Sequence, residues 1–104
     1  MIIEERDYRI RAGYLSEFLD KYRELGLPVQ QEHLGDPHAF FTSEIGELNH
    51  VVSMWRYADL AERASKRSRM LSDPRWPGYL NSIKGLIDVQ NIRILSPTAF
   101  SPLK

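Results

Sequence analysis

The chain has 104 residues, the length of one ordinary domain, so we expect residues 1–104 to form a single domain and exclude a two-domain arrangement. Its 14 basic and 14 acidic side chains cancel, which argues against a general binder of nucleic acid or of an anionic membrane surface, since neither would be attracted over long range. The absence of cysteine excludes disulfide scaffolds, thiolate zinc sites and cysteine nucleophiles.

The start of the chain, MIIEERDYRI, carries acidic groups where a signal peptide needs a basic and then an apolar stretch. No apolar run approaches the roughly 20 residues that a membrane-spanning helix requires. We therefore expect a cytoplasmic protein without a membrane partner.

A strand and then a helix are predicted for the first quarter of the chain. Residues Ile2–Ile10 place every second side chain on one face, which is the period of a strand. From Gly13 onward the apolar side chains recur at the helical spacing. Gly26 is expected to end this helix as its C-terminal cap, and Leu27–Pro37 then predicts a helical turn followed by a loop.

The middle of the chain predicts a hairpin and a second helix. His38–Glu44 and Leu48–Tyr57 read as its two strands, with a glycine-containing turn between them. Asp59 can cap the helix that follows, and Glu62 completes an arrangement like a capping box. The apolar side of this helix is expected to carry Leu60, Ala64 and Leu71.

The last third predicts another helical segment and a final strand. Asp73–Pro74 breaks the second helix, and a clean helical stripe then runs from Trp76 to Ile87. Val89–Leu95 is the last strand, and Ser96–Lys104 is an extended C-terminal tail. The large apolar side chains of this tail, Phe100 and Leu103, are expected to dock on the parent domain or on a partner subunit.

The order strand, helix, strand, strand, helix, strand is typical of the ferredoxin-like βαββαβ fold, of class α+β. Right-handed connections place the first and third strands in the centre of a four-stranded antiparallel sheet, with the helices on one face.

Apolar neighbours on the hairpin strands suggest that both faces of this sheet are covered. Adjacent residues of a strand point to opposite faces, so a half-solvated sheet should alternate apolar with polar residues. The chain's own helices cover one face, so a second copy, packed sheet against sheet as a dimeric α+β barrel, is the simplest cover of the other and could enclose a small ligand. The alternative cover is the chain's own tail. The neighbours are Phe40 and Phe41, Val51 and Val52, and Met54 and Trp55.

The sequence resembles the NIPSNAP family over nearly its whole length. The hairpin segment from Gly46 to Tyr57 is the most specific part. The resemblance implies a homodimeric α+β barrel of ferredoxin-like halves and no settled activity. Related barrels include cofactor-free or haem-dependent monooxygenases, haem-degrading enzymes and lactone isomerases, so fold analogy allows an enzyme without demonstrating one. The matching motifs are Glu4–Tyr8, Glu44–Val52, Trp55–Tyr57, Asp73–Trp76 and Ser96–Leu103.

Glu4, Arg6 and Tyr8 share one face of the first strand. On a covered face, Arg6 could hold a carboxylate or enolate oxygen, Tyr8 could donate a hydrogen bond, and Glu4 could act as a base. The alternative is a buried glutamate–arginine ion pair with a hydrogen-bonded tyrosine, which fixes the structure and does no chemistry.

A second group of candidate ligand-binding residues lies on the hairpin. Trp55 could floor an aromatic pocket, with Asn49 and Tyr57 fixing the orientation of the ligand, although such a tryptophan is more often core or interface. Glu44 and His50, which lie in the family-like hairpin motif, are further candidates.

The three histidines, His33, His38 and His50, have spacings that match no compact metal-ligand set, so no metal site is predicted. No cofactor is predicted either, although haem needs only one proximal histidine and stays open, with His50 as its candidate ligand. His33, beside Glu32, is the candidate acid/base pair.

A run of basic residues marks the second helix. Because the chain is neutral overall, a solvated helix face paired with nearby carboxylates explains this run better than nucleic-acid binding. Arg63 alone, one turn after Asp59, is able to turn inward. The run comprises Arg63, Lys66, Arg67 and Arg69, with Arg75 following.

Three functions remain open at this point. The preferred one is a homodimeric barrel that binds a small, partly apolar ligand. The second is a cofactor-free monooxygenase or isomerase, in which Glu4 or His33 takes a proton and Arg6 stabilises the anion. The third is a non-catalytic structural or interaction module.

Overall fold

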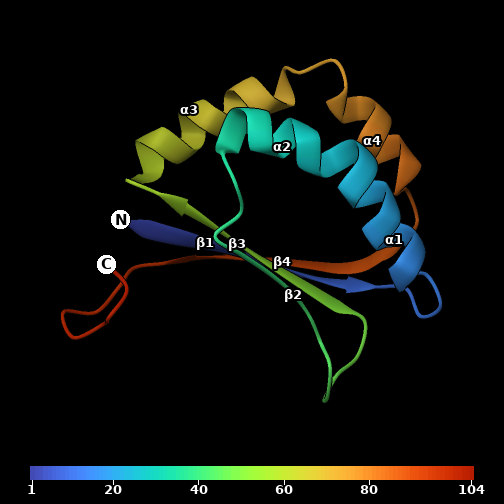
Figure 1. Cartoon of the computed structure of the whole chain (residues 1–104), viewed down its shortest axis with the longest axis horizontal. Helices are drawn as coiled ribbons and strands as arrows, with labels where there is room; N and C mark the ends of the chain where they lie inside the picture. The colour runs from blue at the N-terminus through green and yellow to red at the C-terminus, as the bar shows by residue number, and fades with distance from the viewer.

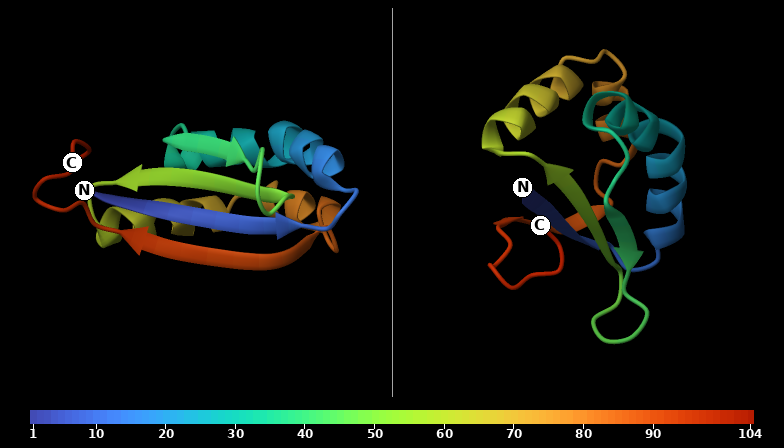
Figure 2. Two further views of the ribbon diagram at one scale, coloured as in Figure 1. Left: turned by 90° about the horizontal axis from the view of Figure 1, so that it is seen from below. Right: turned by 60° about the vertical axis from the view of Figure 1, so that its left-hand side comes forward.

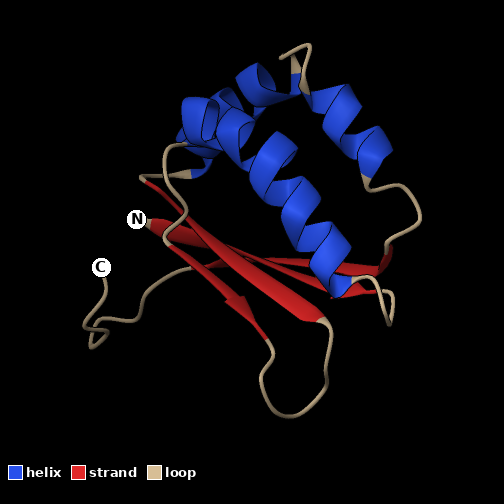
Figure 3. Cartoon of the chain, turned by 45° about the vertical axis from the view of Figure 1, so that its right-hand side comes forward, coloured by secondary structure: helices blue, strands red, loops and turns tan.

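The computed structural model describes all residues 1–104 and consists of one antiparallel sheet with every helix on one of its faces (Figures 1 and 3). The expected ferredoxin-like α+β fold is confirmed. In chain order the elements are β1 (Ile2–Ile10), α1 (Leu15–Lys21), the π-helical turn η1 (Tyr22–Gly26), α2 (Leu27–Leu34), β2 (Ala39–Thr42), β3 (His50–Tyr57), α3 (Leu60–Leu71), α4 (Trp76–Ser82) and β4 (Ile87–Leu95).

The strand order across the sheet is β2-β3-β1-β4, so the first and third strands are central as predicted. Neighbouring strands are antiparallel, and on the central pair Glu4 lies opposite Trp55 and Arg6 opposite Ser53. Directly opposed residues share a face, which here is the face covered by the helices. Figure 2 shows the four strands side by side beneath the helical layer.

Gly26 was expected to end the first helix, but it does not. The chain passes through η1 and continues as α2 to Leu34, and the stop is Gly35, whose φ of 83° favours glycine. Gly26 has a different function, because a Cβ built on it would lie 2.8 Å from ring atoms of Tyr79. The missing side chain therefore allows the aromatic ring of α4 to pack against the helix backbone.

The expected apolar side of α3 is also wrong. Leu60 and Leu71 are 59% and 56% exposed, whereas Met70 is fully buried and Arg63 reaches down to Glu4 on β1. The buried carboxylate of Glu4 explains this orientation of α3. An unpaired charge in the interior would cost more free energy than the exposure of the two leucines. The N-terminal cap is confirmed: Asp59 Oδ1 accepts a hydrogen bond from the backbone N–H three residues later, at 2.8 Å.

The other face of the sheet is only partly covered within one chain. Phe41 is 55% exposed, and Val52 and Met54 are partly exposed beside it. The tail reaches one end of this face, where Leu103 shares a shallow hollow with Ile3 and Met54, while Phe100 is 88% exposed. Within one chain the tail therefore covers only this end of the face, through Ser96, Pro97, Ser101 and Leu103. None of the helices is long and apolar enough to cross a membrane.

Replacing Gly26 by alanine should destabilise the fold, because the new methyl group would overlap the buried Tyr79 ring. Overpacking of this kind costs about 1–3 kcal/mol in the free energy of unfolding, measurable by urea denaturation. Gly78→Ala, on α4 with open space around its Cα, is the matched control and should be neutral or slightly stabilising. Equal stability of the two variants would contradict the packing argument.

Candidate functional site

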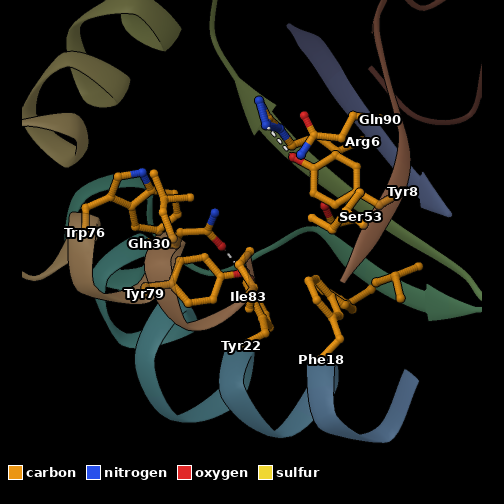
Figure 4. A pocket seen from close by; sticks show the side chains of 14 residues that line it. Arg6, Tyr8, Phe18, Tyr22, Gln30, Ser53, Trp76, Tyr79, Ile83 and Gln90 are labelled. Atoms are coloured by element: carbon orange, nitrogen blue, oxygen red, sulfur yellow. Dashed lines mark hydrogen bonds between the residues drawn. The ribbon is translucent and has the colours of Figure 1, made fainter. Parts of the chain in front are cut away.

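A cavity of about 60 Å³ lies between the helix-facing side of the sheet and the helices α1, η1, α2 and α4. In Figure 4 the residues from the sheet and those from the helices face each other across it. The sheet contributes the polar side chains of Arg6, Tyr8, Ser53 and Gln90, together with the apolar Phe40, Val51 and Ile87, so most of the polar groups of the cavity are on this side. The helices contribute mainly aromatic and aliphatic side chains. The cavity therefore has two ends of different chemistry.

The apolar end is built from aromatic rings that pack on each other. The ring of Tyr22 stacks on that of Phe40 with 4.9 Å between centroids, and Trp76 lies 5.0 Å from Tyr79. The hydroxyl of Tyr22 donates a hydrogen bond to Gln30 Oε1 at 2.5 Å. Burial raises the pKa of Tyr22 far above its ordinary value, so this wall is uncharged at neutral pH.

The polar end is organised by Arg6. Its Nη1 donates to the Tyr8 hydroxyl oxygen at 2.8 Å, and its Nε donates to Glu4 Oε1 at 3.1 Å. Because that oxygen of Tyr8 acts as acceptor, its own proton is free to be donated to a ligand. Burial raises the pKa of Tyr8, with the charge of Arg6 opposing the rise, so the hydroxyl keeps its proton near neutral pH.

Glu4 lies behind this end rather than in the cavity. Its side chain is 0% exposed, and both carboxylate oxygens accept hydrogen bonds from Arg63 of α3, at 3.1 and 3.2 Å, in addition to the bond from Arg6. The carboxylate oxygens of Glu4 are thus committed to two guanidinium groups and do not line the cavity. The arrangement favours the structural alternative for Glu4 and leaves Arg6 and Tyr8 as the groups that line the cavity.

The two aromatic candidates on β3 are core residues. Trp55 is 2% exposed and its ring N–H donates to Ser53 Oγ at 3.1 Å. Tyr57 is 1% exposed, and its hydroxyl is buried without a hydrogen-bond partner. Neither lines the cavity, although both face the helices from the same strand as Ser53.

The hairpin candidates lie away from the cavity. Glu44 is exposed in the turn, and Asn49, with a φ of 66°, accepts a backbone hydrogen bond from Ile10 at 2.8 Å. His50 faces the opposite side of the sheet, where its Nδ1 is 2.6 Å from an Asp7 carboxylate oxygen. That hydrogen bond, helped by Glu47, raises the pKa of His50. Asn49 and His50 thus tie the hairpin to β1.

His33 pairs with Asp73 rather than with its neighbour Glu32, its Nε2 lying 2.9 Å from Asp73 Oδ2. The three groups could approach one metal ion, but Arg75 forms ion pairs with both carboxylates. Arg75 also holds the pKa of Asp73 far below its usual range. The cluster fastens the end of α2 to the segment before α4 and does not line the cavity.

Sequence reasoning missed most of the cavity wall. Phe18, Tyr22 and Tyr79 were recognisable as helical stripes that face a core, and they do so. The sequence carries no signal that these rings leave a gap opposite Arg6, because the gap depends on how the helices sit across the sheet.

Comparison with known proteins agrees with the fold. The NIPSNAP family pattern matches residues 3–102. Protein NipSnap of Drosophila melanogaster is 31% identical over 102 residues, which cover 97% of this chain and 36% of that protein. The chain thus spans about a third of the length of the curated relatives it matches.

Solved structures of NIPSNAP proteins have the same fold. The structure of a NIPSNAP family protein (Atu5224) from Agrobacterium tumefaciens has a TM-score of 0.92 and 43% identity, and the match covers 99% of this chain and 98% of that one. An antibiotic biosynthesis monooxygenase has a TM-score of 0.65 at 16% identity, over 94% and 99% of the two chains. At that identity the likeness shows the fold alone.

Replacing Glu4 by glutamine should leave Arg6 and Arg63 without their shared counter-ion in a buried place. Removing one partner of a buried ion pair costs about 3–5 kcal/mol, so urea denaturation should show a large loss of stability. Glu17→Gln, which breaks the exposed pair with Lys21, is the control and should cost less than about 0.5 kcal/mol. Similar losses in both variants would mean that Glu4 does not hold the two layers together.

Proposed function

We propose, from the chain's membership of the NIPSNAP family, that the cavity between sheet and helices binds a small, partly apolar, oxygen-bearing ligand. The observation that carries the proposal is the position of Arg6 and Tyr8 at one end of a cavity whose other walls are mainly aromatic and aliphatic. Such a mixture of apolar walls and a few convergent polar groups is typical of small-molecule sites.

The size of the cavity limits the ligand. One water needs about 10–15 Å³ of such space, so 60 Å³ accommodates roughly four or five waters. Drug-sized ligands use sites of roughly 300 Å³ or more. A single-ring molecule is therefore the upper limit, and with its ring against Tyr22 and Trp76 and its oxygen toward Arg6 it fits only when the side chains around the cavity move apart.

No reaction is assigned to the site. Glu4 is engaged by two arginines, and His33 pairs with Asp73 outside the cavity, so the acid/base candidates from the sequence do not face the ligand space. Arg6 and Tyr8 provide binding and orientation, which is what the proposal requires.

Leu80 tests the site because it lines the cavity from α4 and is partly exposed. Leu80→Trp should fill the opening and weaken the binding of benzamide, a neutral single-ring probe, at least tenfold. Binding is measured by NMR from the side-chain amide resonances of Gln30 and Gln90, which both line the cavity. Leu71→Trp, on an exposed leucine of α3 outside the cavity, should bind benzamide as the wild type does. Unchanged binding by Leu80→Trp would refute the site.

We also propose that a second copy of the chain covers the free face of the sheet. This face presents Phe41, Val52 and Met54 to solvent within one chain, next to the paired charges of Glu5 and Arg93. A face with apolar residues and both signs of charge suits association with its own copy. The cavity lies on the opposite side, so the ligand proposal does not depend on the dimer.

Light scattering should give about 24 kDa, twice the 12.1 kDa of one chain. Phe41→Lys places a charge on the free face and should shift the mass toward that of the monomer. Leu71→Lys, on the helical side, should leave the mass unchanged. A wild-type mass of 12 kDa at high concentration would exclude the dimer.

A further inference from the structure

Three side chains of the polar end lie next to one another on the central strands. Arg6 is directly opposite Ser53 in the sheet, and Tyr8 follows Arg6 on the same face of β1. Directly opposed residues of antiparallel strands have their Cβ atoms about 5 Å apart. All three side chains line the cavity, and Arg6 Nη1 lies 2.8 Å from the Tyr8 oxygen. One ligand atom above them can therefore contact more than one of these groups.

The oxygen atoms that could accept a hydrogen bond from a ligand at this end are already engaged. A guanidinium group has no acceptor atom. The Tyr8 oxygen accepts from Arg6, and the Ser53 oxygen accepts from the ring N–H of Trp55 at 3.1 Å. An indole nitrogen can only donate, so the direction of the second bond is fixed. The hydroxyl hydrogens of Tyr8 and Ser53 form no hydrogen bond within the chain and are available to a ligand.

The wall on the helical side adds a donor of the same kind. Gln30, from α2, is 8% exposed and lines the cavity. Its Oε1 accepts the hydrogen bond of the Tyr22 hydroxyl, and its amide N–H groups have no partner within the chain. Figure 4 shows Gln30 on the helical side of the cavity, across from the side chains of β1. Tyr79 and the exposed Gln90 can donate or accept, so the surplus of donors belongs to the polar end and to Gln30.

We propose that the ligand presents to Arg6, Tyr8 and Ser53 an acceptor oxygen that carries no hydrogen, and that it is a small neutral carbonyl compound rather than an alcohol. The proposal rests on the ligand function above and adds the chemical class of the ligand. A hydroxyl group in the same place would leave its own hydrogen among donors, and a buried donor without an acceptor is costly. Polar groups of this kind discriminate between analogues more strongly than apolar walls do.

The ion pair beside the cavity favours a neutral carbonyl over a carboxylate. Arg6 reaches the cavity with its Nε bonded at 3.1 Å to Glu4, whose side chain is 0% exposed. The protein itself therefore supplies a counter-charge to Arg6. An ionised carboxylate would move from water to walls that are mainly aromatic and aliphatic, and this transfer costs more free energy than that of a neutral carbonyl.

The test compares cyclopentanone with cyclopentanol, which has nearly the same shape but carries a hydrogen on its oxygen. Wild-type protein should bind the ketone at least fivefold more tightly, measured by NMR titration of the Gln30 side-chain amide. Hydrogen bonds from the protein should also lower the carbonyl stretching frequency of bound cyclopentanone below its value in hexane, measured by infrared spectroscopy.

Gln90→Glu is the informative variant, because Gln90 is exposed, lies opposite Tyr8 and lines the cavity. Its carboxylate would supply the acceptor that the polar end lacks, so the affinities for ketone and alcohol should become nearly equal. Asn91→Asp is the matched control, because the next residue of β4 points to the other face of the sheet, and it should keep the wild-type preference. An unchanged preference in Gln90→Glu would overturn the polar end as the source of the selectivity.

The possible outcomes separate the carbonyl class from the ligand function itself. Equal affinity of the wild type for ketone and alcohol, or tighter binding of the alcohol, would overturn the carbonyl class and leave the cavity as a binding site. Tighter binding of cyclobutanecarboxylate, an anion of similar size, would overturn the assignment to a neutral compound. Binding of none of the three molecules, or binding that Leu80→Trp does not weaken, would overturn the ligand function as well.

Discussion

The carboxylate of Glu4 is the interaction on which the arrangement of the layers depends. It is buried near the start of β1 and accepts hydrogen bonds from Arg6 of its own strand and from Arg63 of α3. A buried charge of this kind is tolerated only when it is paired on every side. The pairing turns α3 so that arginines face the sheet, and it directs Arg6 toward the cavity.

The pairing of Glu4 also distinguishes residues that hold the layers together from residues that are free to contact a ligand. Glu4 accepts hydrogen bonds from both Arg6 and Arg63, whereas the proton of the Tyr8 hydroxyl has no partner within the chain. Unsatisfied polar groups in a protein interior are costly, so an uncommitted hydroxyl proton beside a cavity supports the proposal of a bound molecule. The binding proposals follow from this difference.

The sequence predicted what depends on local pattern. Alternation in Ile2–Ile10, the hairpin and the cap at Asp59 were all readable, and they suffice for the fold. The orientation of α3 was not readable, because the side that faces inward is decided by Glu4, which is 59 residues from Arg63 in sequence. For the candidate site, Arg6 and Tyr8 were readable from their strand, but the aromatic wall opposite them depends on tertiary packing.

The number of residues in the π-helical turn η1 determines the orientation of α2, whichever residues those are. Helix α2 follows α1 without a break, and its Gln30 meets Tyr22 across the turn. An ordinary helix advances by about 100° per residue, so a deletion within Tyr22–Gly26 would rotate α2 by about that angle and carry Gln30 away from the cavity. Sequence insertions and deletions among relatives should therefore avoid these five positions, even where substitutions are frequent.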